Sequence, residues 1–169
     1  KSIKSIFATF ISAAQRNVDT CFSTTVYQNA NLSSYRFEIG SVRYPQADVI
    51  VNDNKSEVMA ELHKAFGKFG DYSHSSCVRP RHLQNVNVAC NEVAKLESCG
   101  LAAFGIGIDL EAFQRVALES GINTSDRSLP INFVYQKSAS TTTDTHADFY
   151  VLSDAIYYLN LDGTVSVSV

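Results

Sequence analysis

Tryptophan is absent from this sequence, methionine occurs once and proline three times. No run of apolar residues is long enough to span a membrane, and the first residues do not form a signal peptide. Basic residues number 14 against 17 acidic ones, and the net charge of -3 argues against broad binding along nucleic acid, which needs a concentrated positive field, while leaving room for a local basic patch. We therefore expect no membrane span and no specific nucleic-acid partner.

Cysteine is present, but not at metal-binding spacing. The four cysteines include no CxxC pair, which excludes a zinc site of the usual type. Their density in a chain of this size favours reduced, buried thiols over disulfide bridges. These residues are Cys21, Cys77, Cys90 and Cys99.

Length and composition indicate one domain. A chain of 169 residues, of which 45% are hydrophobic, can bury a core without metal or disulfide support. We expect a single domain over residues 1–169. Because the first residue is Lys rather than Met, we also expect this domain to be a piece of a longer protein.

The segment 32–42 is an alternating strand that ends irregularly. Its apolar residues alternate with polar ones, which predicts one buried and one solvated face. Gly40 and Pro45 then interrupt the pattern, and we expect the chain to bend or break between Gly40 and Gln46 at an edge of the sheet. A second, shorter strand is expected over 48–51.

Residues 56–69 change to the helical period. Asn54, with Glu57 three residues later, has the spacing of a capping box, and Gly67 or Gly70 supplies the stop. The apolar face of this predicted helix consists of Val58, Leu62, Phe66 and Phe69.

The other periodic segments also favour strands. The first twelve residues are apolar on both faces, which predicts a strand buried on both faces. Gly105 and Gly107 lie in a further strand and imply close packing against one of its faces. Additional strands are expected over 129–135 and from residue 146 onward, with a short helix over 110–121 and a type I′ hairpin turn at Asp162-Gly163. The sum predicts an all-β, antiparallel jelly-roll β-sandwich with one or two short helices inserted in loops.

Candidate catalytic residues occur without a family signature around them. Cys77 and Cys90 lie near His74 and His82 in sequence, which would suit a Cys-His pair, but a polar loop with half-buried thiols is the much better explanation of these residues. Such a hydrolase remains the third hypothesis.

Candidate metal and acid-base residues are equally isolated. His146 and Asp148 share one face of a predicted strand, where they would more simply be solvated. Asp109 and Glu111 are suited to the start of a helix, where acids favour the positive end of the dipole. We predict no catalytic, cofactor-binding or metal-binding residues, no cofactor, and hence no enzyme.

The order of three segments resembles a known family. "KSIKSIFATF", "NLSSYRFEIGSVRYPQ" and "EVMAELHKAFGKF" are similar in order and spacing to the C-terminal part of double jelly-roll major capsid proteins, of the Polinton, adintovirus and virophage type. The most distinctive match is S-Y-x-F-x-I-G-S-x-x-Y-P-Q, which begins at Ser34. "FGIGIDLEAF", "SGINTSDRSLPINFVY" and the last segment from His146 follow in the same order.

This resemblance implies a structural role. The chain would be the C-terminal barrel of a larger two-barrel capsid protein that assembles as trimeric, pseudo-hexameric capsomers into an icosahedral shell. Its partners would be other capsid subunits, penton and minor capsid proteins and a maturation protease. Its location would be the virion, and the host cytoplasm or nucleus during assembly. Phe66 and Phe69 would either seal the barrel or form a subunit interface.

A lectin-like carbohydrate-binding jelly roll is the alternative function. The same sandwich binds sugars where exposed aromatic residues form a platform, and the eight tyrosines supply material for one. Tyr157 and Tyr158 are expected on opposite faces of their strand, so only one of them would point outward. The absence of tryptophan argues against this reading, because sugar platforms favour that residue.

Overall fold

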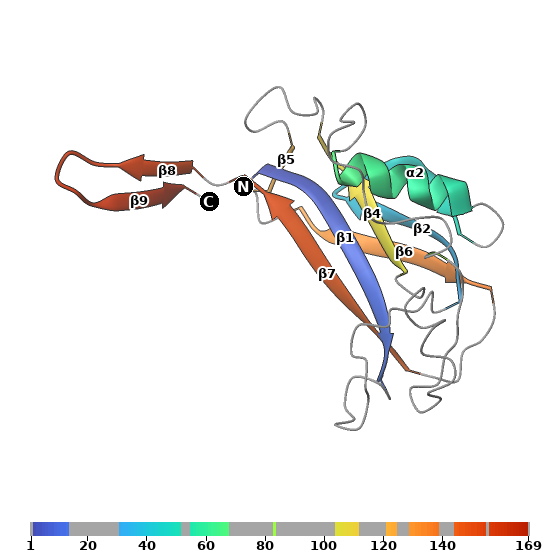
Figure 1. Cartoon of the computed structure of the whole chain (residues 1–169). Coiled ribbons are helices and arrows are strands. Elements are labelled where there is room, and N and C mark those ends of the chain that lie inside the picture. The colour runs from blue at the N-terminus through green and yellow to red at the C-terminus, as the bar shows by residue number, and fades with distance from the viewer. Residues whose placement is uncertain are drawn as a thin grey trace.

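The structure is a computed structural model, and it describes residues 2–13, 31–51, 55–67, 83, 104–111, 121–124, 129–138, 144–154 and 156–168. Figure 1 shows two packed sheets, a helix across part of the outer surface and a hairpin that projects from one end. The elements are β1 (Ser2–Ser12), β2 (Leu32–Ile39), β3 (Val42–Ile50), α2 (Lys55–Ala65), β4 (Gly105–Asp109), β5 (Ile122–Asn123), β6 (Ile131–Lys137), β7 (Thr145–Ser153), β8 (Ile156–Leu159) and β9 (Val165–Ser168).

The first sheet is built around β1. This strand pairs antiparallel with β7 along one side, and with β4 and β5 along the other. The second sheet has the order β3-β2-β6 and is also antiparallel. Consecutive strands such as β1 and β2, or β6 and β7, lie in opposite sheets, as they do in a jelly roll. The prediction of an all-β antiparallel sandwich with an inserted helix is confirmed.

The core lies between the two sheets. Tyr35 and Phe37 of β2, both about 1% exposed, face Ile106 and Ile108 of β4 and the inner residues of β1. The ring of Phe133 lies 5.1 Å from that of Phe37 and 6.1 Å from that of Phe10, so aromatic contacts join the two sheets. The alternation of residues 32–39 thus fixes which face of β2 is buried.

Helix α2 covers the outer face of the first sheet, which explains why β1 is apolar on both faces. The helix residues Val58, Leu62 and Ala65 are buried. The helix contacts β4 most, with further contacts to β3 and β1. Ser5 donates a hydrogen bond to the Ala65 carbonyl at 2.8 Å. The predicted helix is confirmed over 55–65, and Gly67, with a φ of 61°, provides its stop.

The close packing expected at the glycines occurs at Gly107. A Cβ atom built there would lie 3.0 Å from both the Ala65 Cβ and Leu62 Cδ1 atoms, and 3.1 Å from Phe7 Cδ1. Glycine at this position therefore lets the helix approach β4. Gly105 has no such neighbour: its nearest contact would be the Ala8 carbonyl oxygen at 3.7 Å.

The segment after β2 differs from the expectation of a broken strand. Gly40, with a φ of 61°, turns the chain into β3, which runs from Val42 to Ile50 as one strand and absorbs the short strand expected at 48–51. Pro45 is accommodated because β3 is an edge strand among the described strands, and because the pairing with β2 shifts register between Tyr35 and Phe37. Sequence alone did not separate a bulged edge strand from a broken one.

The C-terminal hairpin was predicted correctly, but its turn type was not. Strands β8 and β9 are joined by a three-residue loop, Leu161–Gly163, closed by a bond from the Asn160 N–H to the Thr164 carbonyl. A type I′ turn needs a positive φ at both central residues. Here Gly163 has a φ of 81°, but the φ of Asp162 is not positive. The Asp162 carboxylate instead accepts hydrogen bonds from the Thr164 N–H and hydroxyl.

Several predictions fall outside the described residues. These are the second helix beyond Glu111, the polar tip after Ser138, all four cysteines, His74, His82, Phe69 and Asn54. Among the helices described here, none is long and apolar enough to cross a membrane.

Candidate functional site

The sandwich has one long side at which inner-face residues reach solvent. Strand β6 ends the second sheet and β7 ends the first, so both are edge strands in the described part of the chain. Tyr135 of β6 lies opposite Tyr35 of β2 in the sheet, yet its side chain is 50% exposed against 1% for Tyr35. Phe149 of β7 is 47% exposed, although its partner Ala8 is fully buried.

Between these two strands lies an apolar groove of about 280 Å³. We call this feature the open groove, and its lining residues are Phe10, Leu32, Phe133, Tyr135, Lys137, Thr145, Ala147 and Phe149. Phe133 forms its floor and stacks on Tyr135 with ring centroids 5.3 Å apart, while the Phe149 ring lies edge-on at 5.4 Å. Lys137 is the one charged residue in this lining, and its Nζ atom lies 5.9 Å from the Tyr135 ring centroid.

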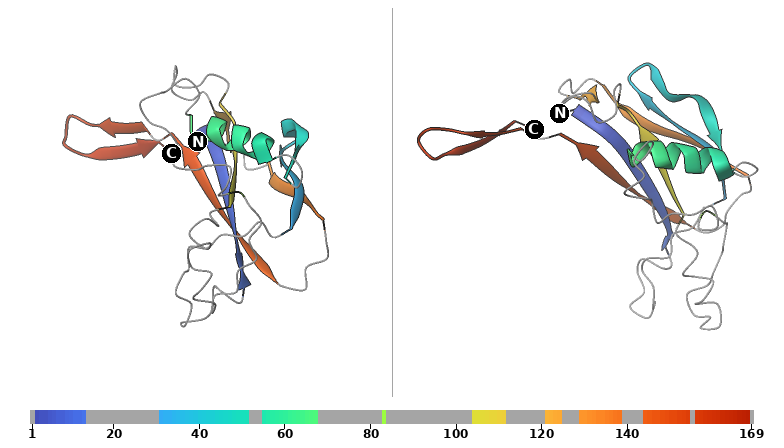
Figure 2. Two further views of the ribbon diagram at one scale, coloured as in Figure 1. Left: turned by 45° about the vertical axis from the view of Figure 1, so that its right-hand side comes forward. Right: turned by 45° about the horizontal axis from the view of Figure 1, so that its top comes forward.

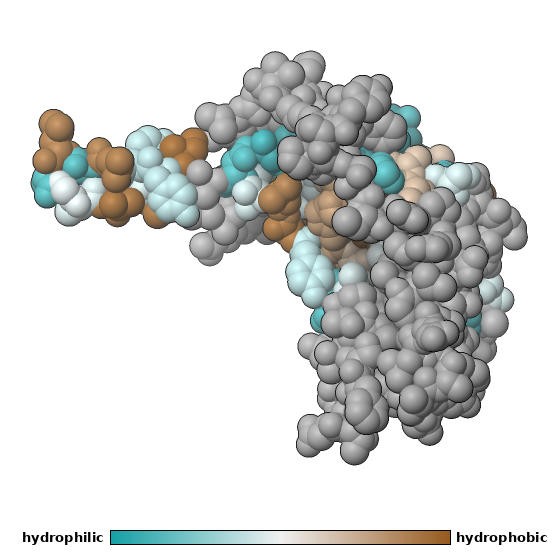
Figure 3. Space-filling view, in the orientation of Figure 1, coloured by the Kyte–Doolittle hydropathy of each residue, from teal (hydrophilic) through white to brown (hydrophobic). Residues whose placement is uncertain are grey.

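The β8–β9 hairpin presents a second apolar surface. Its register places Tyr157 opposite Val167 and Leu159 opposite Val165, so these four side chains share one face of the hairpin. We call this surface the hairpin face; its members range from 47% exposed for Val167 to 82% exposed for Leu159. The other face carries Tyr158 opposite Ser166. Figure 3 shows apolar residues along this projecting arm.

Among the described residues, the contacts that tie the hairpin to the body lie at its base. The Asp154 N–H donates to the Ser2 carbonyl at 3.1 Å, and Lys4 Nζ lies 3.2 Å from the Asp154 carboxylate and 3.0 Å from that of Glu111. The hydrogen bond to Glu111 is the largest cause of a raised Lys4 pKa, and the bond to Asp154 adds to it. Figures 1 and 2 show the strands beyond this base extending away from both sheets.

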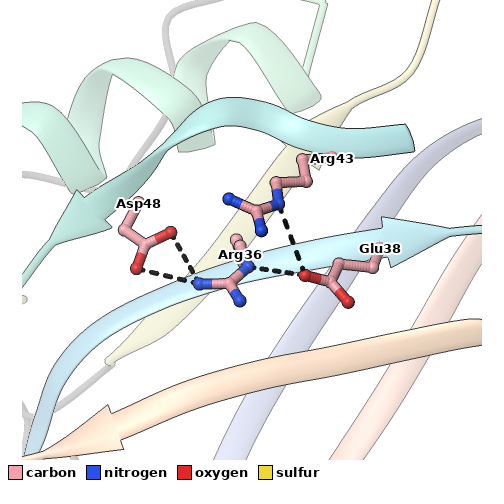
Figure 4. A network of polar contacts seen from close by, with 4 residues as sticks. All are labelled: Arg36, Glu38, Arg43 and Asp48. Carbon is pink, nitrogen blue, oxygen red and sulfur yellow. Dashed lines mark hydrogen bonds and ion pairs between the residues drawn. The ribbon is translucent and has the colours of Figure 1, made fainter. Parts of the chain in front are cut away.

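The solvated face of β2 carries a balanced ion-pair network. Arg36 Nε lies 2.8 Å from Glu38, and Arg36 NH1 bonds both oxygens of Asp48 at 2.9 and 3.0 Å, as drawn in Figure 4. Arg43 lies 3.6 Å from the same Glu38. Two cations face two anions, so the network joins β2 to β3 and leaves no surplus charge for an ionic ligand.

The predicted chemical candidates do not converge on a site in the described residues. His146 and Asp148 do share the outer face of β7, opposite Ile11 and Thr9 of β1. Throughout the described ranges, however, no three His, Cys, Asp or Glu side chains are grouped to hold a metal ion. Glu111 pairs with Lys4, and the Asp109 carboxylate accepts from the Glu111 N–H, so both acids have structural contacts.

Phe66, a possible interface residue by sequence, is partly exposed to solvent and partly packed within the chain. The side chain is 41% exposed, and its ring packs on Phe7 with centroids 4.9 Å apart. Residue-by-residue sequence reading missed the open groove, because alternation in β6 and β7 indicates a buried inner face and does not show that a side of the sandwich is uncovered.

Comparisons of the chain with family models, curated proteins and solved structures gave no match. The geometry is therefore the main observation on function: two exposed apolar surfaces, the open groove and the hairpin face, on a rigid β-sandwich.

Proposed function

We propose that this chain is a structural capsid subunit: the C-terminal jelly-roll domain of a double jelly-roll major capsid protein, which forms trimeric, pseudo-hexameric capsomers in an icosahedral shell. Its partners would be other capsid subunits, penton and minor capsid proteins, and a maturation protease. It would be located in the virion, after assembly in the host cytoplasm or nucleus.

The observation that carries this proposal is the amount of apolar surface left exposed. Monomeric proteins expose apolar patches of roughly 300–600 Å² at most, and larger ones mark interaction surfaces. Here Tyr135 and Phe149 stand at the open groove and Leu159 on the hairpin face, each about half exposed or more. Such surfaces suit a subunit whose neighbours cover them.

The fold and the sequence pattern support the same role. A sandwich with a helix packed on one sheet is a rigid unit, since its core is continuous across both sheets. The segment from Ser34 to Gln46, which carries the resemblance to capsid proteins, forms β2, the Gly40 turn and the bulged start of β3. This distinctive pattern therefore corresponds to one structural unit.

The test is to find the native polypeptide in its source. An antibody against this domain should detect a band well above the 18.6 kDa of this chain, and the band should sediment with particles that the antibody decorates in electron micrographs. A band that stays in the soluble fraction, with no decorated particle, would overturn the capsid proposal.

A carbohydrate-binding module is the second candidate, favoured by the exposed tyrosines. Tyr150 of β7 is 53% exposed and Tyr157 of the hairpin 67% exposed, and both rings are available to stack on a sugar. Tyr157 and Tyr158 do lie on opposite faces of β8, as the sequence predicted, but Tyr158 is also 52% exposed, so the expectation that only one of the two would point outward is wrong. Specific retention on a glycan array, lost when Tyr150 or Tyr157 becomes Ala, would favour this function over the capsid role.

A further inference from the structure

We propose that the hairpin face of one copy of this chain docks in the open groove of a second copy. The inference rests on the proposed function in one respect only, that copies of the chain associate. It adds that the hairpin face is the donor surface, which inserts, and that the open groove is the acceptor surface, which receives it. It also names the residues that determine the contact.

The hairpin has the properties of a segment that needs a partner. An isolated two-stranded hairpin is marginally stable in water, and three strands or packing on another element are needed for independent stability. In the described part of the chain, the extensive contacts of β8 and β9 are with each other. Yet one face of this hairpin is wholly apolar, with Tyr157 67% and Leu159 82% exposed. Burial of that face against a second surface would stabilise it.

The open groove has complementary properties. Half of its lining residues are aromatic, and β6 and β7 on either side each pair with a neighbour along one edge only, among the described strands. Edge strands with an unpaired side accept strands from other chains. A flat, apolar hairpin could therefore cover Tyr135 and Phe149 and lie along one of these edges.

The donor and acceptor surfaces of one copy point apart, which favours a second copy. Strand β7 begins in the groove, at Thr145, and runs away from it to Ser153. Bonds to Ser2 and Lys4 then hold Asp154 at that far end. The hairpin continues outward from there, so its tip lies beyond the end of the sandwich rather than over the groove (Figures 1 and 2).

Charge and area also agree. From Ile156 to Ser168 the hairpin carries one charged side chain, Asp162, at the tip, and the groove lining carries one, Lys137, of opposite sign. The half-exposed apolar residues of the two surfaces would together bury on the order of 1,000 Å², which reaches the lower size limit of a specific interface. Because donor and acceptor differ, the contact is heterologous and is repeated from copy to copy, which gives a ring if the rotation between copies closes and an open filament if it does not.

Two adjacent tyrosines offer a matched test of the donor. Tyr157 belongs to the hairpin face and Tyr158 to the opposite face of the same strand. In sedimentation velocity of the 169-residue chain, wild type should associate with rising concentration. Tyr157→Asp should weaken association at least about tenfold, which corresponds to about 1.4 kcal/mol. Tyr158→Asp should leave it within about twofold.

The acceptor has its own matched pair. Tyr135 points into the open groove, whereas its neighbour Gln136 is exposed on the other face of β6. Tyr135→Asp should weaken association as Tyr157→Asp does, and Gln136→Asp should not. Far-UV circular dichroism checks the fold of each variant. Leu159→Asp replaces Tyr157→Asp should the latter disturb the hairpin, because Leu159 is the more exposed of the two.

Mixing the two deficient variants decides the arrangement. Tyr157→Asp keeps an intact groove and Tyr135→Asp an intact hairpin, so the mixture should form a one-to-one complex of about twice 18.6 kDa and stop there. If the mixture stays monomeric, an intact hairpin does not dock in the intact groove of another copy, and the proposal is wrong. If wild type is monomeric up to millimolar concentration, the hairpin face does not bind a second copy, and the proposal is equally wrong. None of these outcomes depends on whether the native protein sediments with particles, so the capsid proposal can fail separately.

Discussion

The two long sides of the sandwich differ in what covers them. At β4, helix α2 packs so closely that Gly107 is needed, and Leu62 and Ala65 are buried. At β6 and β7 the corresponding inner-face residues, Tyr135 and Phe149, are about half exposed. The covered side therefore contributes to the stability of the chain, and the open side leaves apolar area exposed, which we propose serves association. Substitutions on the two sides should separate these roles.

The largest expected effect is on the covered side. Leu62→Ala should lower the free energy of unfolding by about 2–5 kcal/mol, because it removes a 4% exposed side chain and leaves a cavity between helix and sheet. Leu152→Ala is the matched control on β7: that leucine is 54% exposed, and its loss should cost roughly 1 kcal/mol or less. Urea denaturation measures both. Equal costs would show that the two sides are not distinct.

The second effect tests the fit of the helix. Gly107→Ala should cost about 1–3 kcal/mol, because the new methyl group would overlap Ala65, Leu62 and Phe7 at about 3 Å. Gly105→Ala, two residues away on the same strand, meets nothing closer than 3.7 Å and should leave stability unchanged or raise it by about 0.5–1 kcal/mol. A neutral Gly107→Ala would mean that the helix can shift away from β4 without loss.

The covered side was the easier one to predict from sequence. The helix is encoded locally, by the apolar period at Val58 and Leu62 and the glycine stop at Gly67. The glycines of β4 indicated close packing without identifying the packing element. The alternation of valine and serine in β9 indicated the hairpin. It did not indicate that the turn is the three-residue loop Leu161–Gly163.

The open side could not be predicted in the same way. Alternation in β6 marks Tyr135 as an inner-face residue, and a strand pattern carries no information on whether a neighbouring strand lies beside it. Exposure at an edge is a property of the whole topology. The same holds for β3: Pro45 signals an interruption, and only the register with β2 shows that the interruption is a bulge in an edge strand.

The third prediction concerns alkaline pH. Burial raises the pKa of Tyr35 above its ordinary value of 10.0, and Glu61 and Glu57 of the helix add to the effect. The folded state keeps a phenol proton that the unfolded state releases above that pH. The contribution of Tyr35 to stability is thus fully present below pH 10. Above pH 10 the free energy of unfolding should fall by up to about 1.4 kcal/mol per pH unit. Urea denaturation between pH 9 and 11 measures this slope.

Tyr35→Phe is the variant that isolates this effect. It should reduce the alkaline slope, at a neutral-pH cost of about 1 kcal/mol for the lost 3.3 Å hydrogen bond to the Gly107 carbonyl. The same slope in Tyr35→Phe and in wild type would assign the alkaline loss to other groups.

The smallest expected effect lies at Phe66, where the two roles meet. The ring is 41% exposed and packs on Phe7, so Phe66→Ala should cost about 0.5–1.5 kcal/mol of stability from the lost ring pair, with a further share from burial. If association runs through the open groove and the hairpin face, this variant should sediment like wild type. Weaker association at unchanged stability would instead make Phe66 an interface residue, as the sequence allowed. The helix side would then contribute to assembly as well as to folding.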